Sequence, residues 1–167
     1  MKFYIAIIAT LIVLSALFSC IRQPEFPDEP IITYVDMNKL SILQGNKIDA
    51  ADTLTIRFSF TDGDGDLGTS TDSFDVFLTD SRDGFVNNFK LPVIPDKGSG
   101  NGISGEITIR IPNTPFNICC TYPDGSTACQ PNSRFPTDTF SYSIQIRDRN
   151  NRFSNVIQTE TVTIQCK

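Results

Sequence analysis

The strongest constraint on the fold is a strictly alternating stretch in the first half of the chain. In residues 54–61, LTIRFSFT, the apolar side chains of Leu54, Ile56, Phe58 and Phe60 alternate with threonine, arginine and serine. Successive side chains of a β-strand point to opposite faces, so this pattern is typical of a strand with one buried face. We therefore expect a core strand here, in a sheet whose apolar face packs against a second layer.

Further segments have the composition or the alternation of short strands. They cover residues 31–36, 73–79, 85–91, 105–111, 139–148 and 155–166. Turn-forming residues lie between most of them, and no helical period follows the apolar start of the chain. About seven short strands of this kind predict an all-β protein with two packed sheets. Residues 37–52 have no clear pattern, and residues 112–136 form a long insert.

The chain begins with an export signal. Lys2 precedes an apolar run over residues 3–18, which is shorter than the ~20 residues of a spanning helix. With its ending, Leu-Phe-Ser-Cys at residues 17–20, this segment resembles a bacterial lipoprotein signal peptide. The resemblance implies that residues 1–19 are removed and that Cys20 carries acyl chains. The alternatives are an ordinary signal peptide and an uncleaved membrane helix.

The residues after Cys20 predict a tether. Residues 20–30 contain three prolines, which disfavour a helix. By resemblance to bacterial lipoproteins, Ile21 stands where aspartate would favour retention in the inner membrane, so the outer membrane is the expected location. The expected organisation is a signal peptide over 1–19, a tether over 20–30 and one domain over 31–167.

Two segments resemble immunoglobulin-like and cadherin-like domains of bacterial surface proteins. They are FSFTDGDGDLG at residues 58–68 and YSIQIRDRNNRFSNVIQTETVTI at residues 142–164. The resemblance implies an immunoglobulin-like sandwich. In that strand order, the loops 62–72, 96–104 and 148–155 share one end with the start of the first strand, and the insert 112–136 lies at the other end.

Carboxylates at alternate positions follow the core strand directly. Asp62, Asp64 and Asp66 are separated by glycines, and Ca²⁺ in proteins is bound by six to eight oxygen ligands. The spacing departs from an EF-hand loop, because Leu67 stands where that loop requires glycine. Immunoglobulin-like order would bring Asp148 to the same end, which makes the four aspartates a candidate calcium site. The alternative is a simple turn with solvated charges.

The composition argues against several classes of function. The chain has no histidine, which removes Ser-His-Asp triads, Cys-His pairs and histidine-ligated zinc. Its formal net charge of −5, with no basic cluster, argues against nucleic acid as a partner. A carboxylate-dependent glycosidase is a remote alternative, because these aspartates share one loop without a fixed separation or an apolar pocket. We therefore expect a protein that is not an enzyme.

Four cysteines remain after Cys20, namely Cys119, Cys120, Cys129 and Cys166. An even set in an exported chain predicts disulfides. A bond between the neighbours at 119 and 120 would be strained, so one of them should pair with Cys129 and the other with Cys166. A four-cysteine zinc site is the alternative, but the CC-x₈-C spacing fits it poorly.

These features together predict a lipid-anchored, non-catalytic module of the cell envelope, with a protein or a glycan as its partner. The alternative is a spacer subunit of a glycan-uptake or secretion complex. In either case the membrane is contacted through the lipid on Cys20. The insert 112–136 would face away from the membrane, so it is the expected contact region for a partner.

Overall fold

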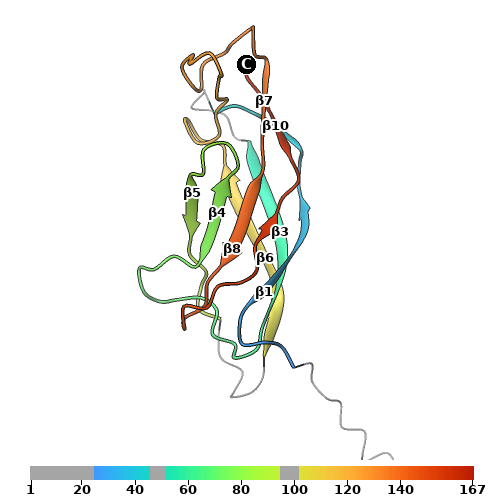
Figure 1. Ribbon diagram of the computed structural model, residues 1–167, viewed down its shortest axis with the longest axis vertical. Helices are drawn as coiled ribbons and strands as arrows, with labels where there is room; N and C mark the ends of the chain where they lie inside the picture. The colour runs from blue at the N-terminus through green and yellow to red at the C-terminus, as the bar shows by residue number, and fades with distance from the viewer. Residues whose placement is uncertain (1–24, 46–51, 95–101) are drawn as a thin grey trace, which may run out of the picture.

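The computed structural model describes residues 25–45, 52–94 and 102–167 (Figure 1). Within these ranges the chain is all-β and contains no helix. Cys20 and the expected signal peptide lie outside the described residues. The strands are β1 Ile31–Met37, β2 Ser41–Leu43, β3 Thr53–Asp62, β4 Val76–Asp80, β5 Val86–Phe89, β6 Ile103–Pro112, β7 Thr137–Phe140, β8 Tyr142–Ile146, β9 Ile157–Gln158 and β10 Val162–Gln165.

The first layer is a sheet with the strand order β1-β3-β6. The predicted core strand is β3 at its centre, antiparallel to both neighbours. Its buried and half-buried residues alternate without a break over Thr53–Asp62. The pairing of β3 with β6 runs over the whole length of both strands, with Phe58 opposite Ile107. The central strand is therefore fixed on both edges, and Asp62 stands at its end.

The second layer consists of two sheets that continue each other along the chain. One has the order β5-β4-β8-β9 and the other the order β2-β10-β7. Only Ser141 separates β7 from β8, and residues 159–161 separate β9 from β10. In Figure 1, β7 and β10 accordingly lie beyond β8 along the long axis of the molecule.

The core lies between the two layers. Side chains of β3 and β6 in the first layer, such as Leu54, Phe58 and Ile109, belong to one buried cluster with Leu78 of β4 and Ile144 of β8 in the second. Burying a side chain of this size contributes about 1.5–3 kcal/mol. This arrangement is consistent with a β-sandwich, and the prediction of an all-β protein is confirmed.

Two predicted strands are each divided in the structure. Residues 139–148 form parts of β7 and β8, because the chain stops pairing with β4 at Tyr142 and pairs with β10 before it. At the break, the Ser141 amide donates to Ser81 Oγ at 3.0 Å. Residues 155–166 form β9 and β10, and Val156, just before β9, is 59% exposed. The sequence pattern cannot register a change of partner strand.

Other strand boundaries also differ from the prediction. Residues 73–75 precede β4 rather than opening it, and Phe74 is 47% exposed. The Asp75 carboxylate accepts a hydrogen bond from the Leu91 amide at 3.2 Å, while the Asp75 backbone bonds to Phe89 on one side and to Arg147 on the other. β2, a three-residue strand that pairs in parallel with β10, was not predicted.

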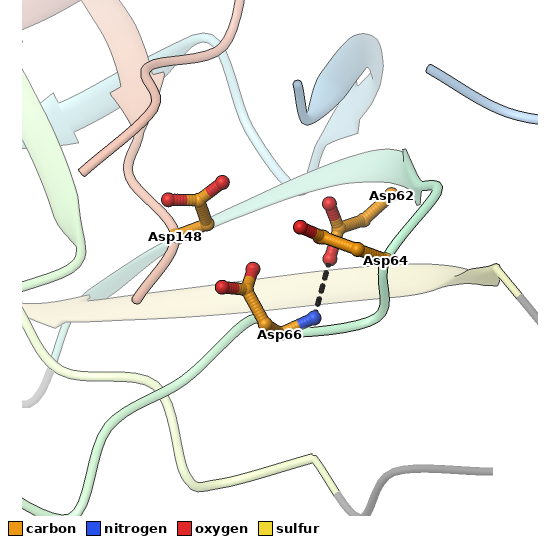
Figure 2. A group of neighbouring side chains, drawn as sticks. All are labelled: Asp62, Asp64, Asp66 and Asp148. Atoms are coloured by element: carbon orange, nitrogen blue, oxygen red, sulfur yellow. Dashed lines mark hydrogen bonds between the residues drawn. The ribbon is translucent and has the colours of Figure 1, made fainter. Parts of the chain in front are cut away.

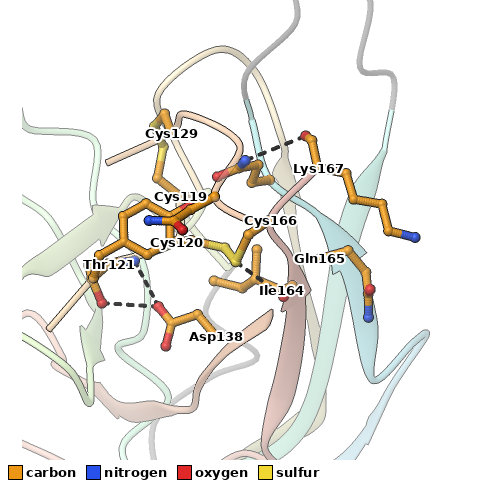
Figure 3. Close-up of a disulfide and its surroundings, with 12 residues drawn as sticks. Cys119, Cys120, Thr121, Cys129, Asp138, Ile164, Gln165, Cys166 and Lys167 are labelled. Carbon is orange, nitrogen blue, oxygen red and sulfur yellow. Dashed lines mark hydrogen bonds between the residues drawn. A yellow bond between two sulfur atoms is a disulfide. The ribbon is translucent and has the colours of Figure 1, made fainter. Parts of the chain in front are cut away.

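The two ends of the molecule carry different features. The insert and the C terminus lie at one end, and the start of β1 lies at the other (Figure 1). At the first end, Cys119 pairs with Cys129 and Cys120 with Cys166, with Cα–Cα distances of 4.7 and 5.9 Å. This is one of the two arrangements that the sequence left open. Both disulfides hold the insert, and the second joins it to the end of the last strand (Figure 3).

Candidate metal centre

The four predicted aspartates come together at the end of the molecule where β1 starts. Asp62 is the last residue of β3, Asp64 and Asp66 lie in the loop after it, and Asp148 lies just beyond β8. One carboxylate oxygen of each can be chosen so that all four lie within 4.8 Å of one another. Figure 2 shows the four side chains pointing toward a common centre.

The backbone of the aspartate loop is shaped by its first and last residues. Asp62 Oδ2 accepts a hydrogen bond from the Asp66 amide at 2.9 Å, which closes the loop into a tight turn. Gly65 adopts φ 71°, a left-handed conformation that favours glycine. Leu67 is completely buried and anchors the loop in the core. This anchoring explains why leucine stands where an EF-hand has glycine.

Asp148 is held by the turn that follows it. Its Oδ1 accepts a hydrogen bond from the Arg152 amide at 2.7 Å, and its own amide donates to the Arg152 carbonyl at 3.1 Å. Asn151 takes φ 63° inside this turn. The turn is joined to the aspartate loop, because the Arg149 amide donates to the Asp66 carbonyl at 3.3 Å. The two loops therefore form one unit.

One oxygen of each carboxylate has no hydrogen-bond partner in the described part of the chain. These buried atoms are Oδ1 of Asp62, Asp64 and Asp66 and Oδ2 of Asp148. Asp62 and Asp148 are 0% and 3% exposed. In Asp62, Asp64 and Asp148 the other oxygen accepts a hydrogen bond that holds the side chain in place. Buried polar atoms are costly without a partner, so this arrangement calls for a ligand at the centre.

Arg152 supplies positive charge at the edge of this cluster. Its Nη1 is bonded to Asp64 Oδ2 and lies 3.8 Å from Asp148 Oδ2. Asn150 Nδ2 also donates to Asp64 Oδ2, at 3.3 Å. Neither residue approaches the four partnerless oxygens closely enough to donate to them. Four carboxylates with one guanidinium leave an excess of negative charge that a divalent cation would reduce.

The electrostatics of the cluster show the same excess. Burial, followed by repulsion from Asp64 and Asp66, raises the pKa of Asp62 to about 7. Burial and the nearby Asp148 and Asp64 raise the pKa of Asp66 to about 6. Burial opposes ionisation of Asp64 as well, but its bond to Arg152 outweighs this and lowers its pKa. In the absence of a cation, the cluster therefore retains protons near neutral pH.

The size of the cluster suits Ca²⁺. Calcium–oxygen distances are about 2.3–2.6 Å, so ligands on opposite sides of the ion lie about 5 Å apart. The four oxygens lie within 4.8 Å of one another, so one metal ion can contact all of them. Mg²⁺ demands a tighter octahedron at about 2.0–2.1 Å and keeps several waters. Four carboxylates converging from two loops form a group that could hold a metal ion.

Comparison of the chain with protein-family models, with curated proteins and with solved structures finds no match. Among the described residues, no helix is both long and apolar enough to cross a membrane.

The sequence predicted the four aspartates of this cluster but missed the residues that surround it. Arg152 and Asn150 lie in the loop that was expected to share this end, and their basic and amide side chains were the available signal. The contact of Asp28 with Arg152 was also missed, because Asp28 was assigned to a solvated tether.

The raised pKa values predict a pH dependence. Because the folded pKa values of Asp62 and Asp66 lie above the ordinary 3.8, the metal-free protein should lose stability as the pH rises from about 4 through about 7. Calcium requires the ionised carboxylates, so its stabilising effect should grow over the same range. Thermal unfolding of metal-stripped protein with and without Ca²⁺ at pH 5, 6.5 and 8 measures this. An equal calcium effect at pH 5 and 8 would contradict it.

Proposed function

We propose that this chain is a calcium-stabilised, lipid-anchored immunoglobulin-like module of the bacterial outer membrane. The observation that carries the proposal is the set of four buried carboxylate oxygens that converge without hydrogen-bond partners. The ion has a structural role: it joins the loop after β3 to the turn after β8. Adding Ca²⁺ to metal-free protein should therefore raise the unfolding temperature, whereas equimolar Mg²⁺ should raise it less.

The order of the strands supports the immunoglobulin-like assignment. In that fold the first, second and fifth strands share one sheet, and the third, sixth and seventh share the other. Here β1, β3 and β6 form one sheet, and β4, β8 and β9 lie in another, with β5 added at its edge. The Pro92 that follows β5 by three residues suits such an edge position.

The lipid anchor rests on the Leu-Phe-Ser-Cys segment ending at Cys20. Several acyl chains give stable anchoring, because each buried CH₂ contributes about 0.8 kcal/mol. Metabolic labelling with a fatty acid should mark the protein, and Cys20→Ala should abolish both the label and the membrane association. Labelling that persists in Cys20→Ala, or a wild-type protein without label, would refute the anchor.

One observation favours a binding role over that of a spacer. A pocket of about 630 Å³ lies between the β4–β5 hairpin and the disulfide-held insert. Phe85 and Phe116 line it and are 63% and 76% exposed. Phe116 also has φ 68°, a conformation that is costly for a bulky residue. Exposed aromatic rings beside a preformed pocket are typical of contact sites for partners.

A photo-crosslinking amino acid at position 116 tests this binding role in intact cells. The matched control is the same amino acid at position 153. Phe153 is also exposed, but it directly follows Arg152 at the end of the molecule that carries the four aspartates. A partner bound at the pocket gives an adduct from position 116 and none from position 153. Adducts from neither position would favour the spacer alternative.

A further inference from the structure

The first residues of the described chain lie directly against the aspartate loop. The Gly63 amide donates a hydrogen bond to the Pro27 carbonyl at 2.7 Å. A β-carbon on Gly63 would lie 2.3 Å from the Phe26 carbonyl oxygen and 2.6 Å from that of Pro27. Only glycine allows this approach, since any other side chain would displace the segment. The contact falls between Asp62 and Asp64, two of the four candidate ligands.

Arg152 makes a second connection between this segment and the carboxylates. Its guanidinium donates to the Asp28 carbonyl at 3.3 Å and lies 3.8 Å from Asp28 Oδ2. The same guanidinium is bonded to Asp64 and lies 3.8 Å from Asp148. One side chain therefore touches residues 26–28, which we call the linker segment, through Asp28 and touches two candidate calcium ligands.

A third contact comes from the phenyl ring of Phe26. This ring is half-buried, and its Cδ2 would lie 2.8 Å from a β-carbon on Gly102. Such a β-carbon would also lie 3.0 Å from the Asp62 carbonyl oxygen. The linker segment thus packs against Gly63 and Gly102, which lie side by side next to the backbone of Asp62.

We propose that docking of the linker segment and calcium binding are energetically coupled, so that calcium sets how the domain is held on its membrane anchor. The inference rests on the proposed calcium site. An ion that fixes Asp62 and Asp64 holds the Gly63 amide and Arg152 in the positions that the linker segment contacts. Coupling of this kind is reciprocal, so the docked linker segment strengthens calcium binding by the same factor.

Because the proposed lipid anchor at Cys20 is close in the chain to the linker segment, this coupling affects how far the domain can lie from the membrane. Phe26 follows Cys20 by six residues, which span at most about 20 Å when extended. A docked linker segment therefore holds the end of the domain that carries the four aspartates close to the lipid surface. Release of the segment at low calcium adds residues 26–28 to the connection between Cys20 and the domain, which frees the orientation of the domain.

Cleavage of the detergent-solubilised full-length lipoprotein by a glutamate-specific protease tests the coupling. The probe site is Glu25, which is exposed and directly precedes the linker segment. We expect saturating Ca²⁺ to slow cleavage there by about fivefold or more, within the usual range of coupling between sites. Half of the effect should occur at the calcium Kd that titration calorimetry measures. Asp62→Asn controls for any action of calcium on the protease, and its cleavage should not respond.

Gly63→Ala tests the reciprocal effect, because it displaces the linker segment without removing a carboxylate. The protease should cleave this variant fast with or without Ca²⁺. The variant should bind Ca²⁺ about fivefold or more weakly than wild type. Calcium binding with unchanged wild-type cleavage would overturn the coupling and leave the calcium site standing. Absence of calcium binding would overturn both. The wild-type comparison decides the matter even if Gly63→Ala does not fold.

Discussion

Replacing both Cys120 and Cys166 with serine is expected to destabilise the protein by about 4 kcal/mol. The bond joins residues 46 positions apart, and the chain-entropy model gives about this value for such a loop. Both sulfurs lie in the buried cluster, beside Ile118 and Ile164. Loss of the bond also removes the covalent link between the insert and the end of the last strand (Figure 3), where backbone hydrogen bonds of Cys166 to Asn132 and Pro136 remain.

The second disulfide provides the matched control. Cys119 and Cys129 are 10 positions apart, so their replacement should cost about 3 kcal/mol by the same model. Urea unfolding of wild type and of the two double variants, all at one fixed calcium concentration, measures the difference. A larger loss from the 119–129 pair than from the 120–166 pair would contradict the argument from loop length.

Asp62→Asn is expected to change stability in opposite directions with and without calcium. In metal-free buffer it removes one of four mutually repelling carboxylates from a completely buried position, so the variant should unfold at a higher temperature than wild type. Asparagine keeps an oxygen that can accept the Asp66 amide. With saturating Ca²⁺ the variant lacks a ligand and should gain far less stability than wild type.

Asp83→Asn is a suitable control for this change in the sign of the stability effect. Asp83 is exposed and its Oδ1 accepts a hydrogen bond from the Phe85 amide, so it is a turn aspartate outside the cluster. The difference in unfolding temperature between this control and wild type should be similar in EDTA and in Ca²⁺. An Asp62→Asn protein that is destabilised equally under both conditions would show that Asp62 serves only the turn.

The fold could be predicted wherever a strand keeps the same neighbours along its length. β3 and β6 are half-buried and fully paired, so their alternation appears directly in the sequence. The division of β7 from β8 could not be predicted, since it depends on which strand lies beside Tyr142. β2 was missed because a three-residue strand carries too little pattern.

The candidate site divides in the same way. Asp62, Asp64 and Asp66 lie close together in the chain at the end of β3. The resemblance to immunoglobulin-like domains predicted that Asp148 lies at the same end. The contacts of Arg152 with Asp64 and with Asp28 join residues 88 and 124 positions apart. Such contacts leave no local signature in one sequence. Gly63 was therefore interpreted as a turn residue and not as the residue that the linker segment packs against.

Titration calorimetry of Ca²⁺ into the metal-free protein at pH 8 tests the central claim most directly. Four carboxylate ligands at one centre predict saturable binding of one ion per chain, with a Kd of about a millimolar or tighter. Asp62→Asn should lose this binding, and Asp83→Asn should retain it. The absence of saturable binding in wild type, or equal binding by Asp62→Asn, would contradict the calcium site.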